Sequence, residues 1–306
     1  MTNTNPLITI LGPTASGKTS LAAALAKEIN GEIISADSRQ VYRSMDIGTG
    51  KDLSSYEDTP YHLIDIVDAG DQYNLAEFQE DFKKVLKEIR SRGNFPILCG
   101  GSGMYIQAVL QEFKFPSIPK NDRLRSELEL LSLDELKRQF ETIALDNPYP
   151  TNPSSKKHFI RAIETIEWQK ENEHPLENPS EQISHLIFGL NPKVDVRRER
   201  ISNRLKNRLD EGLLEEVESL IAIGIAPEKL IYYGLEYKWA TLYLEGKLDY
   251  SEFYTQLETG IHRFAKRQMT YFRKMEKDSL KIEWLDWQEP LDKQIDFIKR
   301  KVALLD

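Results

Sequence analysis

The chain has very little cysteine, with Cys99 as the single cysteine among 306 residues. No disulfide can form within the chain, which is typical of a reducing compartment, and the apolar run 96–99 predicts a buried, inert thiol. The five histidines show no metal-ligand spacing, so a structural zinc site is not expected. The sequence also lacks an apolar run of membrane-spanning length, and residues 1–5 lack the features of a signal peptide. We therefore expect a cytoplasmic protein with no membrane partner.

The net charge of −8 is unevenly distributed. Residues 193–208 contain seven Lys or Arg and two acidic residues, and residues 261–277 contain six and one. Because these two segments hold a net +10, the remainder of the chain holds −18. An acidic body with two basic segments can steer a polyanion to one face, so the net charge does not exclude a nucleic-acid partner.

Residues 12–19 match the phosphate-binding motif G-x-x-x-x-G-K-[ST] in full. The apolar run 7–11 predicts a strand before this loop, and an apolar face over residues 21–26 predicts a helix after it. Such a strand–loop–helix unit points successive backbone N–H groups at one anionic ligand. Lys18 adds a positive charge between two phosphates, and Thr19 can place its hydroxyl on Mg2+. The motif predicts a bound diphosphate or nucleotide at Gly12, Pro13, Thr14, Ala15, Ser16, Gly17, Lys18 and Thr19.

Strand and helix patterns alternate through the first third of the chain. The sequence predicts strands over residues 32–37, 61–66 and 96–99, and helices over residues 75–92 and 104–111. This alternation is typical of a parallel sheet covered on both faces, so we expect an α/β fold with a P-loop NTPase-like sheet.

The pattern changes to helical near residue 116. A capping box formed by Ser132 and Glu135 predicts the start of one helix. Strand-like segments return at 184–190 and 282–285. We therefore expect three parts: residues 1–115 as the first part of the core, residues 116–182 as an all-helical insertion, and residues 183–306 as the completion of the core with basic C-terminal helices.

Asp37 ends a predicted strand about twenty positions after the phosphate-binding loop. Ligands of open α/β sheets bind along the carboxyl edge of the strands. A carboxylate at this edge can hold magnesium, act as a general base or accept a hydrogen bond from an amine. Asp-Ser is also typical of turns, so capping of the next turn explains Asp37 equally well.

Both basic segments read as helices. One stripe of the first helix consists of Arg197, Arg200, Arg204 and Arg208. Such a stripe is usually a solvated face with weak ion pairs. Four arginines with no acid among these positions also suit phosphate binding. Tyr271 either fills the core or stacks on a base. The sequence predicts that Ile201, Leu205, Leu209, Ile261, Phe264, Ala265 and Phe272 face inward, and that Arg263, Lys266, Arg267, Arg273 and Lys274 face outward.

Three classes of function fit these features. A small-molecule kinase would use the loop to bind ATP, with the insertion as its lid. An RNA-binding ATPase would need a magnesium-binding carboxylate such as Asp37 or Asp65, but no helicase-type motifs follow. A transferase could instead use the loop to hold the diphosphate of a leaving group.

Six collinear motifs distinguish these classes. Together they resemble the tRNA dimethylallyltransferase, or IPP transferase, family. They are residues 12–19, residues 35–51 (Ser-Ala-Asp-Ser-Arg-Gln-Val-Tyr-Arg-Ser-Met-Asp-Ile-Gly-Thr-Gly-Lys), residues 62–65 (His-Leu-Ile-Asp), residues 92–93 (Arg-Gly) with 96–98 (Pro-Ile-Leu), residues 100–105 (Gly-Gly-Ser-Gly-Met-Tyr) and residues 265–268 (Ala-Lys-Arg-Gln).

The resemblance implies transfer of a dimethylallyl group from dimethylallyl diphosphate to N6 of the adenosine immediately 3′ of the anticodon in tRNA. The catalytic residues would be Lys18, Thr19 and Arg204 at the diphosphate, with Mg2+ on Thr19, and Asp37 as the base. The target adenine would be flipped out of its stack. We expect a monomer, and the alternative remains a P-loop kinase that uses ATP.

The resemblance also implies contacts to the anticodon stem-loop, which the helical insertion would clasp. Two departures stand out: residues 157–161 lack the usual Gln-Arg start, and Glu236 stands where glycine is typical, although an acid beside RNA is unexpected. The implied tRNA-binding residues are Asp37, Ser38, Arg39, Gln40, Ser102, Arg125, Arg161, Lys238, Lys266 and Arg267.

Overall fold

The protein divides into two compact units. Residues 1–113 with 182–306 form one, called the core unit below, and residues 114–181 form the other, called the helical unit. What each unit contributes to function stays a prediction. The computed structural model describes residues 5–112, 118, 120–145, 153–172 and 183–305.

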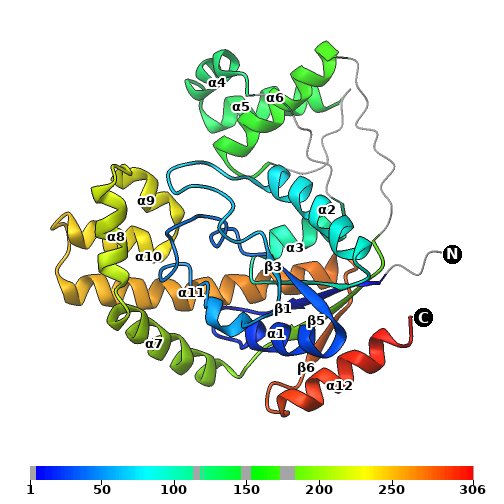
Figure 1. Cartoon of the computed structure of the whole chain (residues 1–306). Coiled ribbons are helices and arrows are strands. Elements are labelled where there is room, and N and C mark those ends of the chain that lie inside the picture. The colour runs from blue at the N-terminus through cyan, green and yellow to red at the C-terminus, as the bar shows by residue number, and fades with distance from the viewer. Residues whose placement is uncertain (1–4, 113–117, 119, 146–152, 173–182, 306) are drawn as a thin grey trace. The chain divides into compact units, whose positions relative to one another are not determined.

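A six-stranded sheet forms the centre of the core unit (Figure 1), and all of its strand pairs are parallel, which confirms the predicted fold class. The strand order is β3-β2-β4-β1-β5-β6, so the strand before the phosphate-binding loop lies in the middle of the sheet. The strands are β1 (Leu7–Leu11), β2 (Gly31–Ser35), β3 (Tyr61–His62), β4 (Phe95–Gly100), β5 (His185–Leu190) and β6 (Ile282–Leu285).

The strand predicted over residues 61–66 is wrong beyond its first two residues. Leu63 and Asp65 have φ angles of 61° and 56°, in the left-handed region that a strand does not use. The chain turns there instead, and Asp65 donates its backbone N–H to the carbonyl of Gln40 at 3.1 Å. The apolar residues of this segment therefore belong to a turn that packs beside the loop after β2.

Helices cover both faces of the sheet (Figure 1). Successive residues of a strand point to opposite faces, so Ile8 and Ile10 pack on the side of α1 and α12, while Leu7 and Leu11 pack with α2, α3 and α11. The helices of the core unit are α1 (Lys18–Ile29), α2 (Leu75–Ser91), α3 (Gly103–Leu110), α7 (Val194–Asp210), α8 (Leu213–Ala222), α9 (Pro227–Tyr233), α10 (Leu235–Leu244), α11 (Tyr250–Lys277) and α12 (Leu291–Val302), with the 3-10 helix η1 (Leu53–Tyr56).

A third apolar cluster lies away from the sheet. Helices α7 to α11 surround Tyr42 and Met45 from the loop after β2, together with Tyr237 of α10, and all three side chains are buried. This packing holds the long segment between β2 and η1 against the C-terminal helices.

The helical unit has its own small core. Its described helices are α4 (Asp122–Glu129), α5 (Leu133–Ala144) and α6 (Lys156–Asn172), and its described residues contain no strand, as predicted. Ser132 and Glu135 form the predicted capping box of α5. Phe140 and Phe159 pack edge to face with ring centroids 5.6 Å apart.

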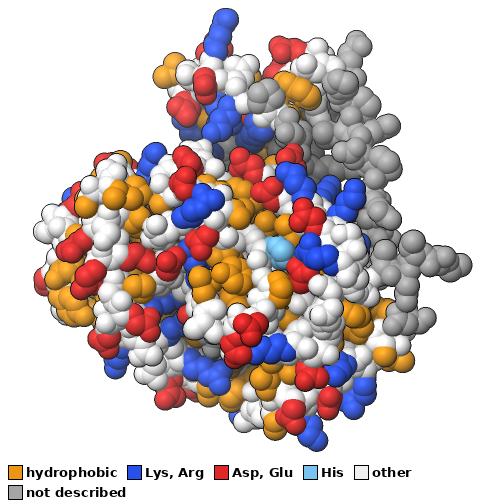
Figure 2. All heavy atoms as spheres, in the orientation of Figure 1, with side chains coloured by type: hydrophobic (Ala, Val, Ile, Leu, Met, Phe, Trp, Pro, Cys, Tyr) orange, Lys and Arg blue, Asp and Glu red, His pale blue; other side chains and the backbone are white. Residues whose placement is uncertain are grey.

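The described helices include none that is long and apolar enough to cross a membrane. On the face seen in Figure 2, acidic and basic side chains lie interspersed, with hydrophobic side chains scattered among them. Cys99 is buried, as predicted.

Candidate active site

The phosphate-binding loop follows β1 directly and includes the first two residues of α1, Lys18 and Thr19. Gly17 has a φ angle of 92°, a conformation that favours glycine, and this turn starts the helix at Lys18. Thr14, Lys18 and Thr19 line a cavity of about 630 Å3, and residues 15–20 line a smaller one of about 260 Å3. The loop thus presents a helix N-terminus to two adjoining hollows.

Two cations lie at this loop. Burial lowers the pKa of the Lys18 ammonium. Arg204 of α7 donates to the hydroxyl of Thr14 at 3.4 Å, to the carbonyl of Gly50 at 3.2 Å and to Asp52 at 2.6 Å. The side chain of Arg204 retains its charge although burial lowers its pKa, so both groups can bind an anion.

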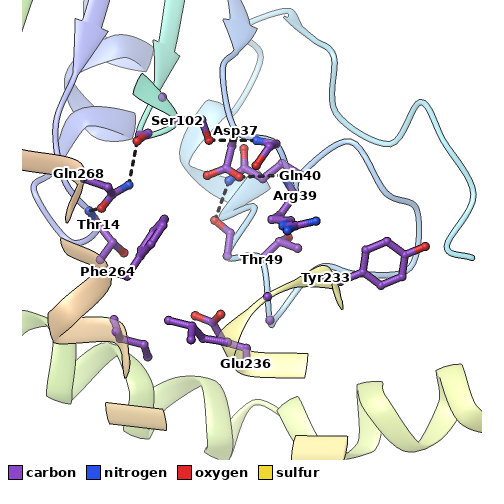
Figure 3. Close-up of a pocket in the computed structure, with 18 of the residues that line it drawn as sticks. Thr14, Asp37, Arg39, Gln40, Thr49, Ser102, Tyr233, Glu236, Phe264 and Gln268 are labelled. Atoms are coloured by element: carbon purple, nitrogen blue, oxygen red, sulfur yellow. Dashed lines mark hydrogen bonds between the residues drawn. The ribbon is translucent and has the colours of Figure 1, made fainter. Parts of the chain in front are cut away.

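Asp37 lines the same large cavity, two residues after the end of β2 (Figure 3). Its Oδ1 accepts a hydrogen bond from the backbone N–H of Arg39 at 2.9 Å. The turn-capping interpretation is therefore correct for one oxygen. The described residues give the other oxygen, Oδ2, no hydrogen bond. The carboxylate can therefore cap its turn through Oδ1 while Oδ2 faces a ligand.

The residues after Asp37 form one wall of the cavity (Figure 3). Gln40 donates to the carbonyl of Gly50 at 3.0 Å, and the backbone N–H of Ser38 donates to the hydroxyl of Ser102 at 3.2 Å. Arg39 donates to the carbonyl of Tyr232 and lies 5.4 Å from the centre of that ring. The predicted base-contacting residues thus lie beside the predicted diphosphate loop.

The sequence model of the IPP transferase family matches residues 40–275 of this chain. The chain belongs to the IPP transferase family. It is 50% identical over 293 residues to tRNA dimethylallyltransferase 1 of Parabacteroides distasonis, covering 94% of this chain and 95% of that protein.

Solved structures of IPP transferases show the same fold. The tRNA isopentenylpyrophosphate transferase of Bacillus halodurans matches with a TM-score of 0.73 and 33% identity, over 98% of this chain and 96% of that one. A eukaryotic dimethylallyltransferase acting on tRNA matches in fold with a TM-score of 0.77 and 24% identity, over 93% of this chain and 74% of that one. The alternative of a P-loop kinase is not favoured by these matches.

Reasoning from the sequence missed the role of Gln268 in this IPP transferase. Its side-chain carbonyl accepts the backbone N–H of Thr14 at 2.9 Å, and its amide donates to the carbonyl of Gly101 at 3.0 Å (Figure 3). One buried side chain therefore joins the phosphate-binding loop to the glycine loop after β4. The available signal was a glutamine three residues after Ala265, on the inward face of the helix.

The prediction that Phe264 faces inward is wrong. Its side chain is 40% exposed and lines the cavity (Figure 3), because at this position α11 borders a hollow and not another helix. Tyr271 is half-buried at the cavity wall and donates to Gln107 at 2.8 Å. Ile261, Ala265 and Phe272 are buried, and the basic residues predicted to face outward are exposed.

The arginine stripe of α7 does not act as one surface. Arg197 is buried and donates to Asn191 at 2.9 Å, and Arg200 lies over the ring of Trp287 at 5.7 Å. Arg208 is also buried, so the interpretation as a solvated face is wrong for Arg197 and Arg208. Only the half of the stripe that carries Arg204 and Arg208 lines the large cavity.

Glu236 also lines the cavity (Figure 3), and the structure explains the acid at this position. Its carboxylate lies 3.2 Å from a guanidinium nitrogen of Arg208. Burial raises the pKa of Glu236, while Arg208 opposes that rise. The pair leaves less uncompensated positive charge at this wall than the arginines alone would.

The other implied tRNA contacts are dispersed. Lys238 and Arg267 line the cavity, whereas Lys266 is exposed outside its lining. In the helical unit, Arg125 and Arg161 both form ion pairs with Glu164, at 2.8 and 2.5 Å. The tRNA contacts of all five stay predictions.

Proposed function

We propose that this protein transfers a dimethylallyl group from dimethylallyl diphosphate to N6 of the adenosine immediately 3′ of the anticodon in tRNA, releasing diphosphate. One observation carries the proposal: Lys18, Thr19 and Arg204, the proposed diphosphate ligands, line the same cavity as the carboxylate of Asp37. The names of the relatives, which are tRNA dimethylallyltransferases, support the choice of both substrates.

The leaving group would be held at the phosphate-binding loop. As the bond between C1 of the prenyl group and the diphosphate oxygen breaks, negative charge develops on the diphosphate. Lys18, Arg204 and the N–H groups at the start of α1 stabilise that charge, and they are already in place before the reaction. The diphosphate leaves as the bond between C1 and N6 forms.

Asp37 would act on the acceptor. An exocyclic amine is a weak nucleophile because its lone pair is delocalised into the ring. A carboxylate oxygen that accepts one N6 hydrogen orients the amine and then takes that proton as the new bond forms. The adenine must leave its stack to reach the cavity, so we include base flipping in the proposal.

A divalent metal ion belongs to the chemistry of this family, and we propose Mg2+. The described residues contain no group of three or more His, Cys, Asp or Glu that could hold a metal. The hydroxyl of Thr19 at the start of α1, beside the buried and unpartnered hydroxyl of Ser16, fits an ion that takes its other ligands from diphosphate and water. When bound there, the ion supplies further positive charge to the leaving diphosphate.

We further propose that the anticodon stem-loop contacts the implied tRNA-binding residues, and that the protein acts as a monomer in the cytoplasm, where tRNA is modified. The exposure of Lys266 and Arg267 and the position of Arg39 at the cavity wall support the tRNA contacts.

The proposal is tested by incubating the protein with unmodified tRNA, Mg2+ and either dimethylallyl diphosphate or ATP, followed by mass analysis of the nucleosides. We expect isopentenyladenosine with the prenyl donor and without ATP. An ATP-dependent phosphorylated product, or no prenylated nucleoside, would contradict the proposal.

Replacement of the proposed base gives a second test. Asp37→Ala should lower turnover by about 10³-fold, since it removes the group that orients the amine and accepts its proton, while tRNA affinity stays near that of the wild type. Asp58→Ala, at an exposed position of the same unit, is the matched control. Equal losses of tRNA affinity and turnover would show that Asp37 only caps its turn.

A further inference from the structure

Glu216 of α8 binds three consecutive backbone N–H groups. Its Oε2 accepts from Asp46 and Ile47, both at 2.7 Å, and its Oε1 accepts from Gly48 at 3.0 Å. The hydroxyl of Tyr237 donates to the same Oε1 at 2.7 Å. Four donors thus converge on one carboxylate, which is more than an exposed surface glutamate normally attracts.

The same loop is held at its end by Lys51. This ammonium group is 1% exposed, donates to the carbonyl of Tyr42 at 2.7 Å and forms ion pairs with Asp46 and Asp65. The ring of Tyr237 also packs against Gly48, where an added Cβ would lie 2.5 Å from that ring. The loop therefore has little freedom to move away from α8 and α10.

The carbonyl groups of this loop face the arginines of the cavity. Gly50 accepts from Arg204 at 3.2 Å and from Gln40 at 3.0 Å, and Gly48 accepts from Arg208 at 3.4 Å. The N–H side of the loop is therefore fixed by Glu216, while its carbonyl side orients the guanidinium groups.

We propose that Glu216 is a positioning residue: it fixes the loop at residues 46–50, and this loop orients the guanidinium group of Arg204 toward the diphosphate. Glu216 does not line either cavity, so it acts through the loop and not on the substrate. The inference rests on the proposed function for the identity of the ligand.

The test uses the full chain and inorganic pyrophosphate as the probe, with binding measured by calorimetry. Glu216→Gln replaces one acceptor oxygen by an amide that cannot accept from the loop, so we expect pyrophosphate to bind about tenfold more weakly. The KM for dimethylallyl diphosphate should rise by the same factor, while the KM for tRNA stays within about twofold of the wild type. Glu218→Gln, at an exposed position of the same helix, is the matched control and should change neither quantity.

Tyr237→Phe provides a milder variant that removes one of the four hydrogen bonds and keeps the ring. It should weaken pyrophosphate binding about threefold, in the same direction as Glu216→Gln. If Glu216→Gln does not fold, Tyr237→Phe alone decides, and wild-type affinity in it overturns the proposal.

Equal pyrophosphate affinity in folded Glu216→Gln and Glu218→Gln would overturn the positioning role. A parallel rise in KM for both substrates would overturn it as well, since that pattern indicates a general structural effect. These outcomes are distinct from failure of the proposed function, in which the wild type binds pyrophosphate but forms no prenylated adenosine.

Discussion

Arginines in the two units of this protein are used in opposite ways. In the core unit, Arg204 is oriented by the carbonyl of Gly50 and the hydroxyl of Thr14, with one ion pair to the half-exposed Asp52. In the helical unit, Arg125 and Arg161 share the carboxylate of Glu164, which is 1% exposed.

The positive charge of Arg204 is available to a ligand, whereas the charges of Arg125 and Arg161 are already paired within the protein. A guanidinium group held by neutral oxygens and one solvent-screened carboxylate keeps much of its attraction for an anion, whereas one paired with a buried carboxylate is largely neutralised. Arg125 and Arg161 connect α4 and α6 through Glu164, which also accepts the backbone N–H of Asn121 at 2.7 Å. Any contact of these two arginines with tRNA would come in addition to that structural role.

The largest effect should follow from removing the available charge. We expect Arg204→Ala to lower turnover by about 10³-fold, because the developing charge on the diphosphate loses a fixed partner in a buried site. Single-turnover prenyl transfer measures this loss. Arg125→Ala is the control from the other unit; a comparable loss there at unchanged stability would break the distinction between the two kinds of arginine.

The next largest effect should follow from removing Glu164, the buried acid of the helical unit. Glu164→Gln leaves Arg125 and Arg161 without their ionic partner, and the local free energy of unfolding should fall by about 3 kcal/mol. Hydrogen–deuterium exchange of α6 amides measures this change. Glu167→Gln, on the same helix with a partly exposed pair to Lys170, should alter exchange little. Unchanged protection in Glu164→Gln would show that the cluster does not hold the unit together.

The same carboxylate predicts a pH dependence. Burial opposes its ionisation, but hydrogen bonds from Arg125, the backbone of Asn121 and Arg161 prevail and lower the pKa of Glu164 from 4.5 to about 2. The unfolded chain therefore binds the proton first, so this stabilisation is complete above about pH 4.5 and is lost as the pH falls toward 2. Exchange of α6 amides at a series of pH values should show the wild type approaching Glu164→Gln on acidification. A constant difference between them down to the lowest pH would contradict the assignment.

The smallest effect concerns an exposed cation. Lys266→Glu should weaken tRNA binding and reduce the slope of log affinity against log salt by about one, as expected for the loss of one phosphate contact. Lys293→Glu on α12, across the sheet from α11, makes the same charge change and should leave the slope unaltered. Identical slopes for the two variants would place Lys266 outside the RNA interface.

Local patterns were sufficient for the elements around the phosphate-binding loop. The apolar run before it and the helical face after it are each specified by neighbours in the sequence, and the structure confirms both. The same holds in the helical unit for the capping box at Ser132, which the structure also confirms. The prediction of a strand beyond His62 was wrong because its apolar residues pack in a turn. The first residue with left-handed backbone there, Leu63, is not of a type that indicates a turn.

The contacts at the wall of the cavity could not be predicted, because they join residues that are far apart in the sequence. Gln268 bonds to residues 254 and 167 positions away, and Glu216 to a loop about 170 positions away, so neither role is visible in a local pattern. Phe264 was misassigned because helical periodicity gives the direction of a side chain but not whether a neighbour or a hollow lies there.

The buried thiol of Cys99 has a practical consequence. Its Sγ lies 3.7 Å from the carbonyl of Lys18, and burial raises its pKa to about 11, so the thiolate that reacts with maleimides and iodoacetamides is scarce at neutral pH. The native chain can therefore serve directly as the background for site-specific labelling. A cysteine introduced at an exposed position should therefore react with the dye much faster than Cys99, with the native cysteine left in place.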